Sequence, residues 1–311
     1  MNLRNRVQVG AYLGGWSMVR RLPARAAYRL ADAAAPVVVR RGGRGVQRLR
    51  ANLGRVAPQR SPAQLDQLTN EAMRSYLRYY VDIFRLPDWT AQQIAAGVRT
   101  EGLEALRAEV DSGRGVVAGL SHQGNWDLVG AWGVQQLGPL TTVAERLEPA
   151  QVYDAFLRFR TGLGMQILPL GQEGLFGTLV ANLRAGHIVP LLMDRDLTST
   201  GLQVDLLGHP ARMAKGPAML ADVTGRSLFP VSTFYERIPD GTAGPFGSGY
   251  RLVLKIHPPV PPPVGNRDAR VLAATQACAD ALGQDIAEHP QDWHMLQRVF
   301  SADLGDRAGA P

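Results

Sequence analysis

Short apolar runs alternate with helical patterns through the middle of the chain, and this alternation limits the folds open to it. The apolar runs cover residues 116–120, 140–144, 166–169 and 188–193, and the helical patterns between them cover residues 128–137, 149–163 and 173–184. Alternation of this kind predicts a layered α/β fold with a largely parallel sheet. Two further runs, at residues 228–237 and 250–257, predict an antiparallel pair at one edge, so we expect a mixed sheet.

Helices are predicted toward both ends of the chain. Residues 24–56 have a helical pattern interrupted at Ala35-Pro36 and at Gly42-Gly43, and Ser61 is placed to cap a helix that ends at Pro87. A further strand is expected at residues 203–208, and further helices at residues 218–223 and 267–288. The chain has no internal repeat and no break in composition, so we expect one domain, residues 1–311, with residues 1–60 as a basic helical portion of it.

A histidine follows the first of the central apolar runs. His122 comes directly after this predicted strand, Gly124 allows a sharp turn, and Asn125 is placed to cap the next helix, with Asp127 in its first turn. One strand-turn-helix would then hold an imidazole, a carboxylate able to orient it, and a helix N-terminus that favours negative charge. This combination suits acyl transfer. A core histidine beside a capping aspartate is the structural alternative.

Two other predicted strands also end in charged residues. The run at residues 140–144 leads into Glu145 and Arg146, and the run at residues 188–193 leads into Asp194, Arg195 and Asp196. Ligands of open parallel sheets bind at the carboxyl ends of the strands, so these endings mark a candidate site.

Several other chemistries lack the residues that they need. The six histidines show no HExxH spacing, and a single cysteine excludes a thiolate zinc site, so no metal site is predicted. No nucleotide-binding loop and no GxSxG nucleophile elbow are present, and Cys278 lies in a helical pattern, where a small buried side chain is expected. A histidine general base that activates a substrate hydroxyl directly, without a covalent acyl-enzyme, is the chemistry that remains.

Positive charge is concentrated at the N-terminal end. The net charge is +7, and residues 1–60 hold thirteen arginines against one acid, Asp32. Such a segment favours phosphate, on anionic lipid or on nucleic acid. The apolar run at residues 7–19 is shorter than the roughly 20 residues that span a bilayer and is flanked by arginine, which predicts an interfacial anchor. A cleaved signal peptide is the alternative, but Arg20 and Arg21 occupy the place of its cleavage site.

An ordered set of motifs resembles one family. The set comprises His122 to Asp127, Thr141 to Leu147, Leu163-Gly164, Asp194 to Thr198, the turn at Gly208, Ala211 to Met213 with Gly216 to Ala218, and Trp293 to Gln297. With these motifs the chain resembles the bacterial lipid acyltransferases of the lipid A late-acyltransferase superfamily, and most closely the actinobacterial phosphatidylinositol mannoside acyltransferases.

The resemblance implies a peripheral enzyme on the cytoplasmic face of the plasma membrane, with an α/β/α fold. It would move palmitate from palmitoyl-coenzyme A, a co-substrate, to the 6-hydroxyl of the mannose on inositol position 2 of phosphatidylinositol mannosides, without a cofactor. By the same resemblance His122 falls at the base position, Asp194 at that of its acidic partner and Arg160 at a substrate-contacting arginine. Asp127 and Asp194 remain alternative partners of His122.

Four charged side chains at the strand ends are the candidates for binding substrate. Glu145 and Arg146 are placed to hold sugar hydroxyls and the inositol phosphate, with Arg195 and Asp196 beside them, although structural ion pairs are an equal alternative. A lipid A-type or lysophospholipid acyltransferase would use the same base on another acceptor. A basic peripheral protein that binds membrane or nucleic acid, with a structural His122, is the non-enzyme alternative; we expect no nucleic-acid partner.

Overall fold

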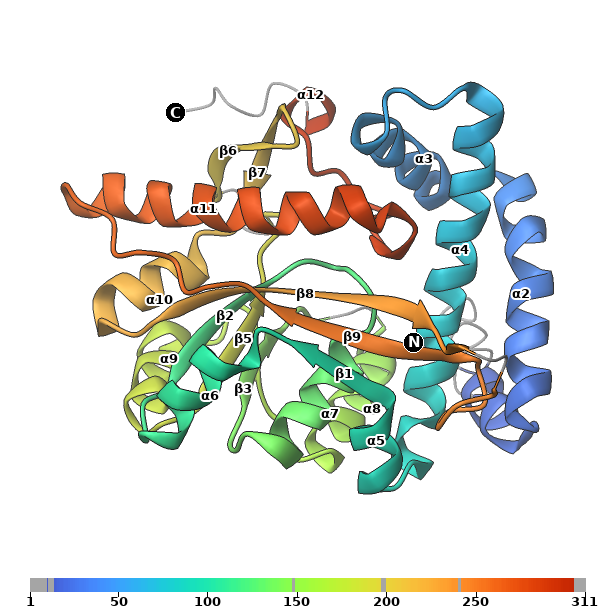
Figure 1. Cartoon of the computed structure of the whole chain (residues 1–311), viewed down its shortest axis with the longest axis horizontal. Coiled ribbons are helices and arrows are strands. Elements are labelled where there is room, and N and C mark those ends of the chain that lie inside the picture. Colours follow the sequence, from blue (N-terminus) through green and yellow to red (C-terminus); the bar gives the residue numbers. More distant parts are fainter. Residues whose placement is uncertain (1–9, 11–13, 147–148, 197–199, 240–241, 305–311) are drawn as a thin grey trace.

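A five-stranded sheet forms the centre of the protein, in the order β1-β9-β8-β2-β5 (Figure 1). The computed structural model describes residues 10, 14–146, 149–196, 200–239 and 242–304. The strands are β1 (Val98–Glu101), β2 (Val116–Leu120), β5 (Ile188–Leu192), β8 (Leu228–Arg237) and β9 (Tyr250–Ile256). All neighbours are parallel except β8 and β9, which confirms the mostly parallel, mixed sheet.

The antiparallel pair does not lie at the sheet edge, contrary to expectation. β1 pairs with β9 in parallel and forms the edge itself. Only four residues long and half-buried for most of its length, β1 has too little apolar pattern to be recognised as a strand.

Two smaller sheets extend this centre. β3 (Thr141–Ala144) pairs in parallel with β4 (Gln166–Pro169). β3 also lies beside β5, where Thr142 Oγ1 donates to the carbonyl of Pro190 at 2.6 Å. β6 (Leu202–Leu206) and β7 (His209–Met213) form an antiparallel hairpin. β7 was not predicted. Its turn is Leu207-Gly208, both with positive φ, the tight geometry that matches the twist of paired strands.

Helices cover both faces of the sheet, which confirms the three-layer α/β/α architecture (Figure 1). α10 (Gly216–Thr224) and α11 (Arg267–Glu288) lie over one face, and α5 (Ala91–Gly97), α6 (Leu103–Asp111) and α7 (Trp126–Gln136) over the other. A separate buried core fills each side. Further helices are α8 (Ala150–Gly162), α9 (Leu175–Arg184) and the short α12 (Ser301–Leu304), and η1 (Leu86–Asp88) and η3 (Pro290–Asp292) are single 3₁₀ turns.

The N-terminal part of the described chain lies at one end of the sheet. Residues 14–21 are helical there, and α2 (Ala24–Arg41), α3 (Arg44–Val56) and α4 (Pro62–Arg85) follow (Figure 1). Ser61 caps α4 as predicted, in a capping box with Gln64. The predicted break at Ala35-Pro36 is wrong, because α2 continues through Pro36. Ala35 is fully buried in the core of these helices, and this packing outweighs the roughly 3 kcal/mol that an internal proline costs. No described helix is long and apolar enough to cross a membrane.

Candidate active site

His122 lies just beyond the carboxyl end of β2, a strand whose residues are all buried. The turn that follows requires Gly124, which has φ +60° and leaves no space for a Cβ atom, since one would lie 2.5 Å from the Thr233 carbonyl oxygen. Asn125 then caps α7, as predicted, by accepting a hydrogen bond from the Leu128 N–H at 3.0 Å. The local sequence therefore fixes where the imidazole can lie.

Asp194 holds the imidazole of His122. It follows β5, which pairs in parallel with β2, so the two side chains meet at the same edge of the sheet. Nδ1 of His122 lies 2.6 Å from Asp194 Oδ1, and the His122 backbone N–H donates to Oδ2 at 2.8 Å. Trp293 Nε1 also donates to Oδ2, at 2.9 Å.

The carboxyl group of Asp194 is fully buried, and its hydrogen bonds compensate for the loss of water around it. Burial alone would raise its pKa; the charge of His122 and the hydrogen bonds from His122 and Trp293 outweigh this, so the pKa lies below its usual value. An ionised Asp194 accepts a hydrogen bond from the Nδ1–H of the ring, so in the neutral imidazole Nε2 is the unprotonated nitrogen. A neutral imidazole in this tautomer is a proton acceptor.

Asp127 does not contact His122; its partners are Arg160 and Tyr79. Arg160 Nε and Nη2 donate to the two carboxylate oxygens at 2.6 and 3.1 Å, and the Tyr79 hydroxyl donates to Oδ2 at 2.9 Å. Burial would lower the pKa of Arg160, but the charge of Asp127 raises it above its usual value. The alternative in which Asp127 orients His122 therefore does not hold, because its oxygens are occupied by this ion pair.

The other predicted charged residues lie at the rim of the same edge. Arg195 Nη2 donates to Glu145 Oε2 at 3.1 Å, and Nη1 donates to the side chain of Gln297. Arg146 is exposed. Asp196 is directed elsewhere: it accepts the backbone N–H of Gly201 at 2.9 Å. Glu145 and Arg195 are thus brought together, whereas Asp196 organises the chain after β5.

The segment that follows α11 closes over the turn containing His122. The Gly124 N–H donates to the Asp292 carbonyl at 2.9 Å, and the His294 N–H donates to the His122 carbonyl at 2.8 Å. His294 itself is buried, with Nε2 2.9 Å from Ser75 Oγ. Burial, with the charges of Arg78 and His122, lowers the pKa of His294 to about 3, so this second histidine stays neutral.

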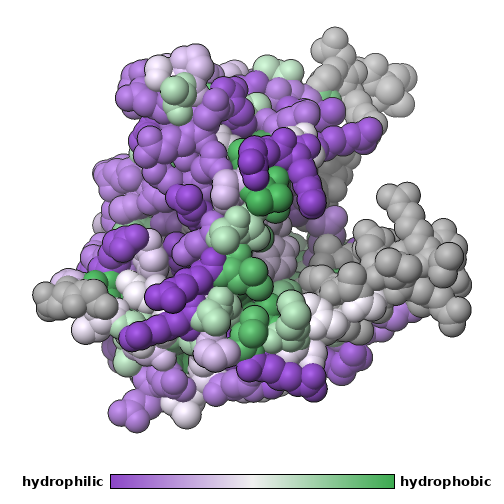
Figure 2. All heavy atoms as spheres, turned by 90° about the vertical axis from the view of Figure 1, so that its right-hand side faces the viewer, coloured by the Kyte–Doolittle hydropathy of each residue, from purple (hydrophilic) through white to green (hydrophobic). Residues whose placement is uncertain are grey.

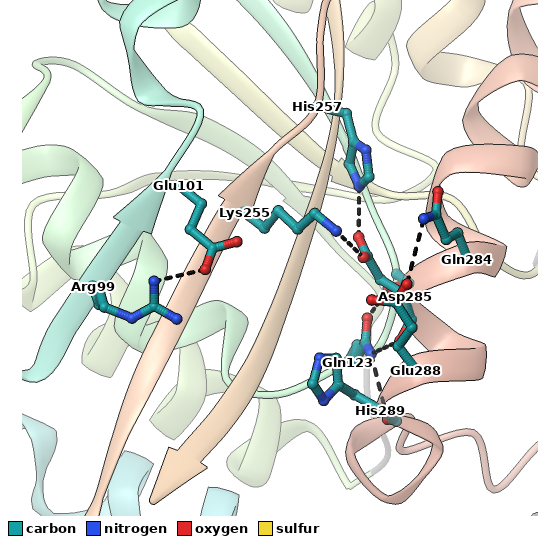
Figure 3. Close-up of polar contacts among 10 residues, drawn as sticks. Arg99, Glu101, Gln123, Lys255, His257, Gln284, Asp285, Glu288 and His289 are labelled. Atoms are coloured by element: carbon teal, nitrogen blue, oxygen red, sulfur yellow. Dashed lines mark hydrogen bonds and ion pairs between the residues drawn. The ribbon is translucent and has the colours of Figure 1, made fainter. Parts of the chain in front are cut away.

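A polar network behind the turn fixes Gln123 (Figure 3). Its amide donates to the Asp285 carbonyl at 3.0 Å, and the Asp285 carboxylate holds Lys255 Nζ at 2.6 Å and His257 Nε2 at 2.5 Å. Burial would raise the pKa of Asp285, but the bonds to His257 and Lys255 lower it to about 2. In the part of the chain that is described, no group of three His, Cys, Asp or Glu residues is arranged to hold a metal ion.

An apolar cavity of about 60 Å³ lies between the sheet and α7. Trp126 lines it and also makes an edge contact with the His122 ring, with 5.4 Å between ring centroids. The walls consist almost wholly of hydrocarbon, from Leu103, Leu106, Leu120, Leu137, Leu140 and Ile188 among others. An apolar chain is the kind of ligand that such walls favour.

A comparison with known families decides the class of protein. A family model described as bacterial lipid A biosynthesis acyltransferase matches residues 3–302. The chain belongs to the bacterial lipid A biosynthesis acyltransferase family. It is therefore an acyltransferase, as its motifs predict.

Relatives of this acyltransferase are similar over nearly their full length. A protein of Mycolicibacterium smegmatis called phosphatidylinositol mannoside acyltransferase is 38% identical over 319 residues, 100% of this chain and 99% of the relative. One of Mycobacterium tuberculosis with the same name is 40% identical over 300 residues, 95% and 89% respectively. The solved structure of 1-acyl-sn-glycerophosphate (LPA) acyltransferase PlsC from Thermotoga maritima is 17% identical, with a TM-score of 0.38 over 70% of this chain and 86% of that chain. That weak likeness adds nothing to the fold described above.

Some residues that build the site of this acyltransferase were not predicted to belong to it. Gln123, Trp293 and His294 belong to motifs that carry the resemblance, but the sequence predicts no role for them, and it places Asp285 only within a helix. Gln123 is 162 residues from Asp285 in the sequence, and no periodicity or spacing links it to Asp285, Trp293 or His294. Only the pairing of residues 289–294 with the His122 turn reveals them, and no pattern within one element signals that pairing.

Proposed function

We propose that the protein transfers a palmitoyl group from palmitoyl-coenzyme A to the 6-hydroxyl of the mannose on inositol position 2 of phosphatidylinositol mannosides. The observation that carries this proposal is the His122–Asp194 pair, in which a buried carboxylate holds Nδ1 and Nε2 is left as a base. The names of the relatives support the choice of acceptor.

In the proposed reaction Nε2 of His122 removes the proton of the acceptor hydroxyl while its oxygen attacks the thioester carbonyl. Asp194 stabilises the imidazolium that forms. The tetrahedral intermediate collapses, the carbon–sulfur bond breaks, and the imidazolium returns the proton to the departing thiolate. The products are an ester and free coenzyme A, and His122 is neutral again.

No covalent acyl-enzyme is part of the proposal. Cys278 is fully buried, and burial raises the pKa of its thiol to about 12, so the nucleophilic thiolate is not formed near neutral pH. A nucleophile of this kind is not needed when the acceptor hydroxyl attacks the thioester directly.

The apolar lining of the cavity beside Trp126 supports a hydrocarbon chain as the group transferred. Its hydrocarbon walls begin at the ring that contacts His122, so a chain that enters there keeps its carbonyl carbon near Nε2. The cavity has room for only a few water-sized groups, and a palmitoyl chain must widen it by moving side chains of α6 and α7.

We propose that Glu145, Arg146 and Arg195 contact the sugar hydroxyls and the inositol phosphate at the rim. Arginine suits the phosphate because its planar fork pairs with two oxygens. Arg160 also contacts substrate in this proposal, because its side chain is held in place by Asp127 and keeps 19% of its surface accessible.

The proposed location is the anionic cytoplasmic face of the plasma membrane, reached through α2. Ala26, Leu30, Ala33 and Val37 are exposed at helical spacing, and Leu30 and Val37 keep 53% and 37% of their surface accessible. Exposed arginines of α2 flank this stripe at positions 25, 29, 40 and 41. Figure 2 shows hydrophobic side chains in a band on this side of the molecule, bordered by hydrophilic ones. An apolar stripe between arginines suits an anionic lipid surface.

Of the predicted anchor at residues 7–19, the structure describes residues 10 and 14–19. Where it is described, Trp16 is turned inward: its ring stacks on Phe84, with 5.1 Å between centroids, and Nε1 donates to the Phe84 carbonyl at 3.1 Å. Trp16 is therefore partly buried against α4, whereas Met18 keeps 54% of its surface accessible, so in the proposal this segment joins α2 in the membrane contact.

Product analysis tests the proposed function. Purified protein is incubated with palmitoyl-coenzyme A and, in turn, with phosphatidylinositol mannoside, a lipid A precursor and a lysophospholipid. We expect mass spectrometry to detect one added palmitoyl group on the mannoside alone, and NMR to place it on the 6-hydroxyl. Transfer to another acceptor but not to the mannoside would refute the proposal, as would a fully active His122→Ala variant.

A further inference from the structure

A second, basic pocket lies between the start of α3 and the segment after His294. Its volume is about 370 Å³, and its walls include Arg44, Gln47 and Arg48 from α3 and Leu296, Gln297 and Arg298 from the C-terminal segment. The two sides are fixed to each other, because the Asn52 amide donates to the carbonyls of Met295 and Gln297, both at 2.8 Å. The pocket is therefore part of the fold and does not arise from a chance approach of surface side chains.

The positive charge of this pocket is only partly balanced. Arg44 and Arg298 are exposed and form no ion pair with a described residue. Arg48 lies 3.2 Å from Asp303, but Asp303 also holds Arg55 at 2.6 Å. The first turn of α3 contains no acidic residue, so the helix dipole adds to the same positive field. Such a pocket favours a polyanion, and arginine forks suit phosphate oxygens.

The pocket is connected to the catalytic pair by a short stretch of chain. Trp293 donates to Asp194, and Gln297 at the pocket wall follows four residues later, a span of at most about 14 Å. Arg195, next to Asp194, also donates to the Gln297 side chain. A substrate that reacts at His122 can therefore place a distant part of itself in the pocket.

We propose that this pocket binds the phosphate groups at the nucleotide end of the acyl-coenzyme A donor, which rests on the proposed function. Coenzyme A carries a diphosphate and a ribose phosphate, and its pantetheine arm separates them from the thioester. Three arginines at some distance from the base match such a ligand. The acceptor carries a single phosphodiester close to its sugars, which suits the rim at Glu145 and Arg146 better.

Binding of coenzyme A itself, measured by calorimetry at low salt, tests the pocket without any transfer reaction. In the double variant Arg44→Gln/Arg298→Gln we expect the dissociation constant to rise about tenfold through loss of charge-assisted hydrogen bonds. A matched control, Arg60→Gln/Arg184→Gln, removes the same charge from exposed sites elsewhere and should bind as the wild type does. Pantetheine, which lacks the nucleotide, should bind all three proteins equally.

Kinetics then assign the phosphate to one substrate. In the double variant we expect KM for palmitoyl-coenzyme A to be about tenfold higher, with kcat and the KM for the mannoside unchanged. Arg44 and Arg298 do not contact the reacting atoms, so their loss should not affect the chemical step. A raised KM for the mannoside instead would overturn the assignment to the donor. If the double variant and Arg298→Gln alone both bound coenzyme A as the wild type does, the pocket would not be the coenzyme A phosphate site. Failure of transfer to any mannoside would refute the proposed function and leave the binding result standing.

Discussion

Asp194 holds the imidazole of His122 at Nδ1, one of its two ring nitrogens. Asp194 occupies Nδ1, and the donors to its other oxygen are the His122 backbone and Trp293, so the carboxylate has little freedom to leave the ring. We expect His122→Ala to lower kcat by about 10²- to 10⁴-fold or more, since removal of a general base typically costs this much. Circular dichroism and thermal unfolding should show an intact fold. An intact variant with near-normal turnover would exclude His122 as the base.

Substitution of Asp194 should reduce activity, whereas substitution of Asp127 should reduce stability. Asp194→Asn removes the carboxylate that fixes the ring tautomer, and we expect kcat to fall by about 10²-fold or more. Asp127→Asn leaves the partly buried charge of Arg160 without its partner, so we expect a loss of up to about 3 kcal/mol in the free energy of unfolding. Denaturant titration and initial rates on both variants separate the two effects. The reverse pattern, with Asp127→Asn stable but inactive, would return Asp127 to the catalytic role.

Cys278 offers a simple test of the covalent alternative. It is fully buried, and its thiol has a strongly raised pKa, so we expect Cys278→Ala to keep its activity within a few-fold. Quench-flow measurement of acylated protein, with palmitoyl-coenzyme A and no acceptor, provides the check. A stoichiometric acyl-enzyme in the wild type that is missing in the variant would demand a ping-pong mechanism.

At the scale of elements, the sequence predicts best where chemistry and local structure coincide. The turn from β2 to α7 was predicted because a buried strand, Gly124 and Asn125 each act on neighbouring residues. The contact of His122 with Asp194 follows from the parallel pairing of β2 and β5. The closure by residues 289–294 and the anchoring of Gln123 on Asp285 were not predictable, because they depend on where α11 ends in space.

The continuation of α2 through Pro36 shows the same limit. Local propensity predicts a break there, and only the burial of Ala35 against the neighbouring helices reverses it. Likewise β1 is a strand only because β9 provides an edge for it. Tertiary contacts therefore decide the elements whose own patterns are weak.

Substitutions on the exposed face of α2 should weaken binding to membranes. Leu30→Ser/Val37→Ser should weaken binding to vesicles that contain phosphatidylinositol, because it removes the apolar stripe proposed to enter the lipid interface. A separate variant, Arg29→Glu, should also weaken vesicle binding at low salt, by roughly 1 kcal/mol or more. Cosedimentation across a salt series measures both. The controls are Leu272→Ser, on exposed α11 surface, and Arg184→Glu, and equal binding by all five proteins would exclude α2 as the docking face.

For the whole molecule, buried His294 should make stability depend on pH. Its pKa is lowered to about 3 in the folded chain, against about 6.5 when unfolded, so between these values the unfolded chain binds more protons. Stability from this group is therefore fully present above about pH 6.5 and falls by up to about 1.4 kcal/mol per unit as the pH drops toward 3. We expect urea unfolding of His294→Gln to lack this part of the slope. Parallel slopes for wild type and variant between pH 6.5 and 4 would contradict it.

The closure of the His122 turn by Trp293 and His294 has a consequence for how the enzyme comes into being. A ribosome releases the chain from its N-terminus, and the motif at His122 emerges long before the residues that complete it. Until they emerge, Asp194 lacks its indole donor and the His122 carbonyl lacks the His294 N–H. The hydrogen bonds that complete the site can therefore form only after residues 293 and 294 have been synthesised. A chain interrupted before residue 293 would keep His122 and Asp194 but would lack the indole and amide donors that hold them in place.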